Sequence, residues 1–267
     1  MYQGGYPAPM NQEMLTWLPA PHSVSVGVDG CKGGWLVATI EDGSLEFNLV
    51  RDLSPLFENT QARVLVDMPM GLPAHERRLC DLEARALLGH RRSTLFPVAT
   101  RPALYAPTYH ECCEVNARLQ GCRVSKQLWN LCAKIRHLDT IIRARADLHE
   151  RVAEGHPELA FLRCSSNCAA LPSKRTPEGL HQRVSVINQL LSTNVRDLID
   201  SFLSHHARNA TVVDCLDAAV LALFLFKGQG GVAFLGDGAQ DEFGIPMRIA
   251  SAPQGIGMSG ALLRPEE

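Results

Sequence analysis

The sequence contains no long apolar run. The longest, at 218–226, has less than half of the roughly 20 residues that a membrane-spanning helix needs, and it predicts a buried helix. Residues 1–22 carry one charged side chain, Glu13, and lack the basic start and apolar centre of a signal peptide. We therefore expect a cytoplasmic protein with no membrane partner and a disordered tail over 1–22.

A CxxC pair is also absent, although the chain has nine cysteines. An odd number at irregular spacing, without a secretion signal, favours reduced thiols over a disulfide framework. Cys164 and Cys168, with the pair Cys112 and Cys113, are the alternative: a structural zinc site. The missing CxxC spacing argues against it.

Two common enzyme signatures are missing as well. The turn at 30–34 lacks the Gly-Lys-Ser/Thr ending of a phosphate-binding Walker A loop. No Gly-x-Ser-x-Gly sequence is present, which argues against an esterase of the α/β-hydrolase type.

Charge is nearly balanced overall but unevenly distributed. The net charge is −2, yet residues 75–151 hold 14 Lys/Arg against 8 Asp/Glu, a local excess of +6 that leaves −8 elsewhere. This asymmetry predicts a basic surface beside an acidic one, suited to a nucleic-acid partner. The alternative is a set of solvated helix faces.

The first part of the sequence has the pattern of a mixed sheet. Alternating, β-branched segments at 24–29, 35–40 and 45–50 are separated by Gly-rich turns, which predicts three antiparallel strands. A short helix at 52–58 and an apolar strand at 63–67 follow. Such a crossover returns the fourth strand parallel to the first and beside it. The fold class is α/β.

Helical periodicity dominates the remainder. The predicted helices span 76–88, with Leu79, Leu82, Ala86 and Leu87 as apolar positions, then 127–148, 177–191, 195–206 and 213–226. Ser125 is the expected N-cap of the second helix. A strand is expected at 151–154 and a hairpin around 241–244. We expect one domain over 23–250, with a basic helical insertion at about 75–150 and a C-terminal tail over 251–267.

Four aspartates stand where such a fold would bring them together. Asp29 and Asp67 end the first and fourth strands, whose carboxyl ends meet at one sheet edge. Asp214 and Asp217 are three residues apart on a late, apolar helix and share one face. Taken singly, an aspartate at a strand end is explained as a turn former, and an aspartate at a helix start is explained by the helix dipole. A cluster without a basic partner needs a cation, and Mg²⁺ or Mn²⁺ suits carboxylate oxygens.

The sequence also resembles the domain-of-unknown-function family numbered 429, regarded as predicted ribonuclease H-like nucleases. The resemblance begins at Gly27–Trp35 and runs through Asp67–Pro73, Arg77–Asp81, Leu88–Ser93, Phe96–Pro97, Ser125–Trp129, Glu154–Phe161, Lys174–Thr176 and Asp214–Ala219. It implies a ribonuclease H-like mixed sheet flanked by helices.

The resemblance extends to Holliday-junction resolvases of that superfamily, where an acid on the first strand, one after the fourth and an Asp-x-x-Asp pair bind two metals. It implies that two Mg²⁺ or Mn²⁺ ions lie between Asp29, Asp67, Asp214 and Asp217. Asp67 stands where the resolvase pattern has Glu, and its shorter side chain alters the metal spacing. Glu158 is a fifth catalytic candidate, or a helix cap, with Glu154 behind it.

The activity implied is two-metal hydrolysis of phosphodiester bonds in nucleic acid. The expected phosphate-binding residues are basic: Lys32, Arg77, Arg78, Arg91 and Arg92. His156 is expected either to move a proton or to be structural. Trp129 is expected to pack in the core rather than stack on a base. Whether the chain forms a homodimer stays open.

Two rival functions remain. The turn after Asp29 also resembles the first phosphate loop of actin-like phosphotransferases, but those need a second duplicated domain, for which this chain is too short. The other rival is a non-catalytic nucleic-acid-binding or scaffold protein that keeps the fold.

Overall fold

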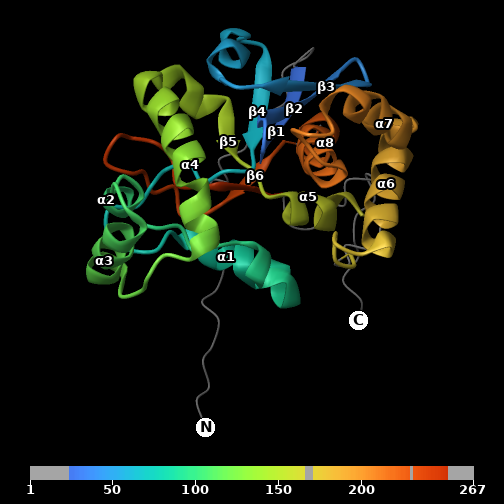
Figure 1. Cartoon of the computed structure of the whole chain (residues 1–267). Coiled ribbons are helices and arrows are strands. Elements are labelled where there is room, and N and C mark those ends of the chain that lie inside the picture. The colour runs from blue at the N-terminus through green and yellow to red at the C-terminus, as the bar shows by residue number, and fades with distance from the viewer. Residues whose placement is uncertain (1–23, 166–170, 229–230, 252–267) are drawn as a thin grey trace, which may run out of the picture.

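The computed structural model describes residues 24–165, 171–228 and 231–251, so the tail expected over 1–22 and residues 252–267 lie outside it. A seven-stranded mixed sheet has the order β3-β2-β1-β4-β5-β7-β6. Figure 1 shows helices α6, α7 and α8 on one side of this sheet and α4 on the other. None of the described helices combines the length and apolar character needed to cross a bilayer.

The three-strand meander is confirmed. Strands β1 (Val24–Cys31), β2 (Gly34–Glu41) and β3 (Ser44–Val50) pair antiparallel in sequence order. Asp42 and Gly43 connect β2 to β3 with φ of 49° and 82°. Positive φ at both central residues is the geometry of a tight hairpin turn, which Asp-Gly adopts readily.

The crossover to the fourth strand is also confirmed. A 3₁₀ helix, η1 (Ser54–Glu58), leads into β4 (Ala62–Val66), which pairs parallel with β1. Strands β5 (Val152–Glu154) and β7 (Ile249–Ser251) continue the parallel sheet, and β6 (Ala233–Leu235) pairs antiparallel with β7. The segment around 241–244 is a turn closed by the bridge between Gln240 and Pro246. Ser251, which we assigned to the C-terminal tail, belongs to β7.

The insertion between β4 and β5 is helical, as expected. Its elements are α1 (Leu79–Leu88), η2 (Gly89–Thr94), α2 (Arg101–Leu104), α3 (Tyr109–Gln120), α4 (Lys126–Ala144) and η3 (Ala146–Glu150). Ser125 caps α4 by accepting a hydrogen bond from the Leu128 N–H. After β5 come α5 (Pro157–Cys164), α6 (Pro177–Leu191), α7 (Val195–His206) and α8 (Val212–Lys227).

Each face of the sheet has its own apolar core. Helix α8 lies in the core on one face, and α4 packs in the core on the other. Side chains alternate along β1, so Val26 and Val28 join the α4 core while Gly27 faces α8. A Cβ on Gly27 would lie 2.0 Å from the carbonyl oxygen of Ala218. Glycine therefore permits α8 to lie directly on the central strand.

Helix α1 departs from the expected orientation. Leu79 and Leu82, part of its apolar pattern, are 40% and 48% exposed, while Cys80, Asp81 and Ala84 are buried. Arg78 and Asp81 form an ion pair inside the protein. A buried ion pair three residues apart turns that face of the helix inward and leaves the leucines outside.

Candidate functional site at the carboxyl ends of the central strands

Asp29 and Asp67 lie side by side. Val28 of β1 pairs with Val66 of β4, and the Asp67 N–H donates to the Val28 carbonyl at 2.8 Å. Each aspartate stands one residue beyond that pair, on backbones roughly 5 Å apart. Asp29 follows Gly27 by two residues, and Asp67 follows Leu65 by two. Because alternate residues of a strand share a face, both aspartates lie on the side of the sheet that α8 covers. The predicted neighbourhood of these two acids on adjacent parallel strands is confirmed.

Helix α8 brings Asp217 to the same place. Asp217 is 2% exposed and lies one residue before Ala218, whose carbonyl faces Gly27 of β1. Asp214, one turn earlier, is half-buried and takes part in a capping box. Its Oδ2 accepts a hydrogen bond from the Thr211 N–H, and the Thr211 hydroxyl oxygen accepts one from the Asp214 N–H. Asp214 therefore has a structural task at the helix start.

Three of the four carboxyls have raised pKa values, mainly because they are buried and also because nearby acids repel their charge. Burial, then the charges of Asp67, Asp217 and Asp214, raise the pKa of Asp29 well above its usual range. Burial and the charge of Asp217 raise the pKa of Asp67 to about 7. Burial also raises the pKa of Asp217, although a lysine opposes it. The cluster carries more negative charge than its surroundings neutralise.

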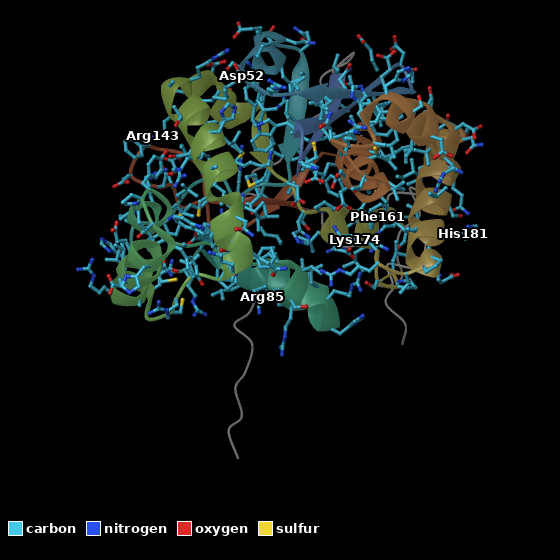
Figure 2. All side chains as sticks on the ribbon, viewed as in Figure 1. Asp52, Arg85, Arg143, Phe161, Lys174 and His181 are labelled. Carbon is cyan, nitrogen blue, oxygen red and sulfur yellow. The ribbon has the colours of Figure 1, made fainter. Side chains whose placement is uncertain are left out.

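That lysine is Lys174, which we did not foresee as a partner of the acids. Its ammonium group donates to Oδ2 of Asp217, and it lies close enough to Asp67 and Asp29 for their charges to raise its pKa. Lys174 is among the residues labelled in Figure 2. The other oxygen of the carboxylate, Oδ1 of Asp217, is buried and has no hydrogen-bond partner among the described residues. Lys174 belongs to the Lys174–Thr176 motif, which was the signal available in the sequence.

Glu158 is held by arginines rather than by the acids. Arg183, fully buried, donates to both of its carboxylate oxygens at 2.8 and 2.9 Å, and Arg91 donates at 3.2 Å. The arrangement joins α5, α6 and η2. With both oxygens occupied, Glu158 ties these elements together, and Arg91 is committed to it instead of being free for a phosphate.

A second buried network lies on the opposite face of the strands. Arg78 is completely buried and pairs with Asp81 and with Glu154, the latter at 2.7 Å. It also donates to the Met70 carbonyl at 2.7 Å, while Glu154 accepts from the Met70 N–H at 3.0 Å. The network therefore anchors the loop that follows Asp67. Arg78 does not present a guanidinium group to a phosphate, contrary to our expectation.

Part of the predicted basic surface is engaged in ion pairs, some of them buried and others at the surface. Arg101 binds Asp139 and Asp241, and Arg145 binds Glu58 and Asp147. Of the residues expected to bind phosphate, three are exposed: Lys32, Arg77 and Arg92. The excess of +6 therefore translates into a weaker surface field than the sequence count implies. Trp129 packs beside Tyr109, with ring centroids 5.8 Å apart, as a member of the core.

A cleft of about 670 Å³ opens beside Asp67. Its lining comes from five segments: the loop after β4, the η2 segment with 95–98, the start of α4, the start of α5, and residues 173–175. Lys174 and Arg175 contribute cationic groups to the lining, and Phe96 and Leu131 contribute apolar surface. The cleft is thus bordered by the strand ends, as expected for an α/β site.

His156 also lines this cleft. Burial lowers its pKa to about 4, so the imidazole is neutral near pH 7. Its Nε2 lies 3.5 Å from the Thr94 carbonyl, and its Nδ1 is buried with no hydrogen-bond partner in the part of the chain that the structure describes. A neutral ring with one free nitrogen can position a ligand, but it is a weak base at neutral pH.

The carboxylates are not arranged as a finished metal site. Within the described ranges, no group of three or more His, Cys, Asp or Glu side chains is placed to hold a metal ion. The donor set still suits a hard cation, since it consists of carboxylate oxygens with excess negative charge and one unpartnered oxygen on Asp217. The alternative zinc site involved Cys168, which lies outside the described residues.

The fold and the site define an α/β protein with an acidic cluster at the carboxyl ends of its central strands. The family described as "Protein of unknown function (DUF429)" matches residues 27–236, which is most of the chain, and the chain belongs to that family. The matched segment starts in β1 and ends just after β6, so it contains every aspartate of the cluster. No curated protein and no solved structure matches the chain.

Proposed function

We propose that this protein is a ribonuclease H-like hydrolase that cleaves phosphodiester bonds with the aid of divalent metal. The observation that carries the proposal is the convergence of Asp29, Asp67 and Asp217 at one sheet edge, with the pKa of each raised. Buried carboxyls that repel one another are stable in the charged form only when a cation is near. Structural clusters of acids are instead paired off by arginines, as Glu158 is here.

The strand arrangement supports the ribonuclease H-like part of the proposal. Strands β3-β2-β1-β4-β5 follow the order that we expect for that fold, with only β2 running against its neighbours. The acids then stand on the first strand, directly after the fourth, and on a late helix. This is the layout that the resemblance to resolvases implies.

The residues that would hold metal are Asp29, Asp67 and Asp217, with Asp214 at the edge of the cluster. When bound there, Mg²⁺ or Mn²⁺ would lower the pKa of an attacking water and neutralise charge on the leaving oxygen. Lys174 would orient a phosphate oxygen, because its ammonium group lies at the mouth of the acidic cluster and borders the cleft. A bound cation would lower the pKa of Asp67 from the value of about 7 that it has without metal, and would hold this carboxylate ionised as a ligand.

The test is a cleavage screen with RNA, DNA, RNA–DNA hybrid and a branched junction, in Mg²⁺, in Mn²⁺ and in chelator. We expect cleavage that needs metal and that Asp29→Asn nearly abolishes. Asp200→Asn, an exposed position on α7, is the matched control and should cleave normally. Full cleavage in chelator would contradict the proposal, as would normal activity of Asp29→Asn.

A non-catalytic binding protein is the second candidate. The ion pair of Lys174 with Asp217 favours it, because an internal ammonium group already supplies one positive charge to the cluster. On this alternative, purified protein binds nucleic acid equally well with and without metal and cleaves nothing.

A further inference from the structure

The cleft has the dimensions of a small-molecule site. Its volume of about 670 Å³ falls within the range of pockets that enclose one ligand of drug or nucleotide size. A nucleic-acid duplex is instead recognised over a broad, open surface. Several of the described arginines that would build such a surface are engaged in ion pairs, Arg91 with Glu158 and Arg101 with Asp139 among them.

Part of the cleft's lining is apolar and includes an aromatic ring. Phe96 is half-buried and belongs to none of the hydrophobic clusters of the described residues, and its ring stacks on no other ring there. Leu131 of α4 is half-buried and lines the same cleft, as do the buried Met68 and Leu95. An apolar ring that faces a cleft instead of a core offers a planar ligand a stacking surface.

The cleft also has a polar and basic part to its lining. Lys174, Arg175 and Asp67 contribute to it. His156 contributes the unpartnered Nδ1, which can bond to a polar edge of a ligand. A nucleotide joins a planar base to an anionic phosphate, and this cleft is lined by both an apolar ring and cationic side chains.

We propose that the cleft binds a single unstacked nucleotide unit, with its base against Phe96 and Leu131 and its phosphate beside Lys174 and Arg175. The substrate class is then a dinucleotide or a single-stranded segment, because the bases of a duplex are stacked and cannot enter the cleft. That the protein cuts a phosphodiester bond of this ligand rests on the proposed function. That the cleft binds a nucleotide does not depend on it.

The experiment measures binding of fluorescent ligands to the full chain carrying Asp29→Asn, in Mg²⁺. The ligands are a dinucleotide, a linear single strand, a circular single strand and a blunt duplex. We expect the single-stranded ligands to bind at least tenfold more tightly than the duplex. Binding of the dinucleotide alone identifies a free small ligand, and binding of the circle identifies an internal segment. Duplex binding as tight as single-strand binding, or no binding of any single-stranded ligand, overturns the proposal.

Variants at Phe96 test the stacking contact. Phe96→Ala should weaken single-strand binding by roughly tenfold, the scale of a lost base–aromatic stack, and Phe96→Trp should restore it. Phe96→Trp should also gain a fluorescence component, absent from wild type, that ligand binding quenches. Phe243→Ala, which removes an exposed ring outside the cleft, is the control and should bind as wild type. Unchanged binding by Phe96→Ala, together with no quenching at position 96, overturns the proposal.

The two proposals fail in different ways. Tight, Phe96-dependent binding without cleavage by the wild-type chain contradicts the proposed hydrolase and leaves the nucleotide site standing. Metal-dependent cleavage of a duplex that Phe96→Ala does not slow contradicts the nucleotide site and leaves the hydrolase standing.

Discussion

The ammonium group of Lys174 binds one oxygen of Asp217, while the other oxygen of that carboxylate is buried and meets no hydrogen-bond partner from residues 24–165, 171–228 or 231–251. Asp217 is thus half satisfied by the protein itself. The lysine reduces the repulsion among Asp29, Asp67 and Asp217 but leaves their pKa values raised. A cation that enters the cluster must compete with Lys174 for Asp217.

This competition predicts that Lys174→Met binds Mn²⁺ at least tenfold more tightly than wild type. Removing a positive charge a few ångströms from the ligands changes the binding energy of a cation by more than the 1.4 kcal/mol that a factor of ten represents. Titration calorimetry with metal-free protein measures it. Arg175→Met, an exposed neighbour, is the control and should change affinity little. Weaker Mn²⁺ binding by Lys174→Met would mean that the lysine supports the metal site.

The pH dependence of stability should reveal Asp67. In the folded protein its pKa is about 7, against 3.8 for the ordinary group, so the folded state retains a proton that the unfolded chain releases. The contribution of Asp67 to the free energy of unfolding is therefore largest below about pH 4, and it is lost as the pH rises through 7. Urea unfolding in chelator should show a steeper fall from pH 4 to 7 for wild type than for Asp67→Asn. Parallel curves would place the pKa of Asp67 near its ordinary value.

The sequence was sufficient to predict which strands bring Asp29 and Asp67 together. Strand periodicity and crossover handedness are rules of local chain geometry, and both residues belong to regular elements. Lys174 could not be placed in the same way. It precedes α6 in a segment without periodicity and meets Asp217 across 43 residues of sequence. Only its position in the Lys174–Thr176 motif of the family indicated that Lys174 could belong to the site.

The sequence also could not predict which charged side chains pair with one another. The number of arginines in the insertion predicts a basic surface, but it does not show which of them form ion pairs. Arg78 and Arg183 are among the largest fully buried side chains, and each lies against a glutamate. The apolar pattern of α1 failed for a related reason, since the buried pair of Arg78 and Asp81 determines which face of the helix turns inward.

Arg78→Met should therefore destabilise the fold strongly. The substitution leaves Asp81 and Glu154 buried without their cation, and loss of one partner of a buried pair costs about 3–5 kcal/mol. Urea unfolding provides the measurement. Arg77→Met at the exposed neighbouring position should change the free energy of unfolding by no more than about 0.5 kcal/mol. Equal stability of the two variants would show that the network around Glu154 tolerates the loss.

Gly27→Ala tests whether the position of α8 on the sheet places Asp217 in the metal site. The added methyl group would lie 2.0 Å from the Ala218 carbonyl oxygen and 2.6 Å from the Ala222 nitrogen, and both are backbone atoms, so the helix itself must move. Overpacking of this kind costs about 1–3 kcal/mol. Because the displaced helix carries Asp217, Mn²⁺ affinity should fall together with the melting temperature. Gly43→Asn, in a turn where a Cβ meets only Phe226 at 3.9 Å, should leave Mn²⁺ affinity unchanged. If Gly27→Ala lost stability but bound Mn²⁺ as tightly as wild type, α8 would not hold the metal.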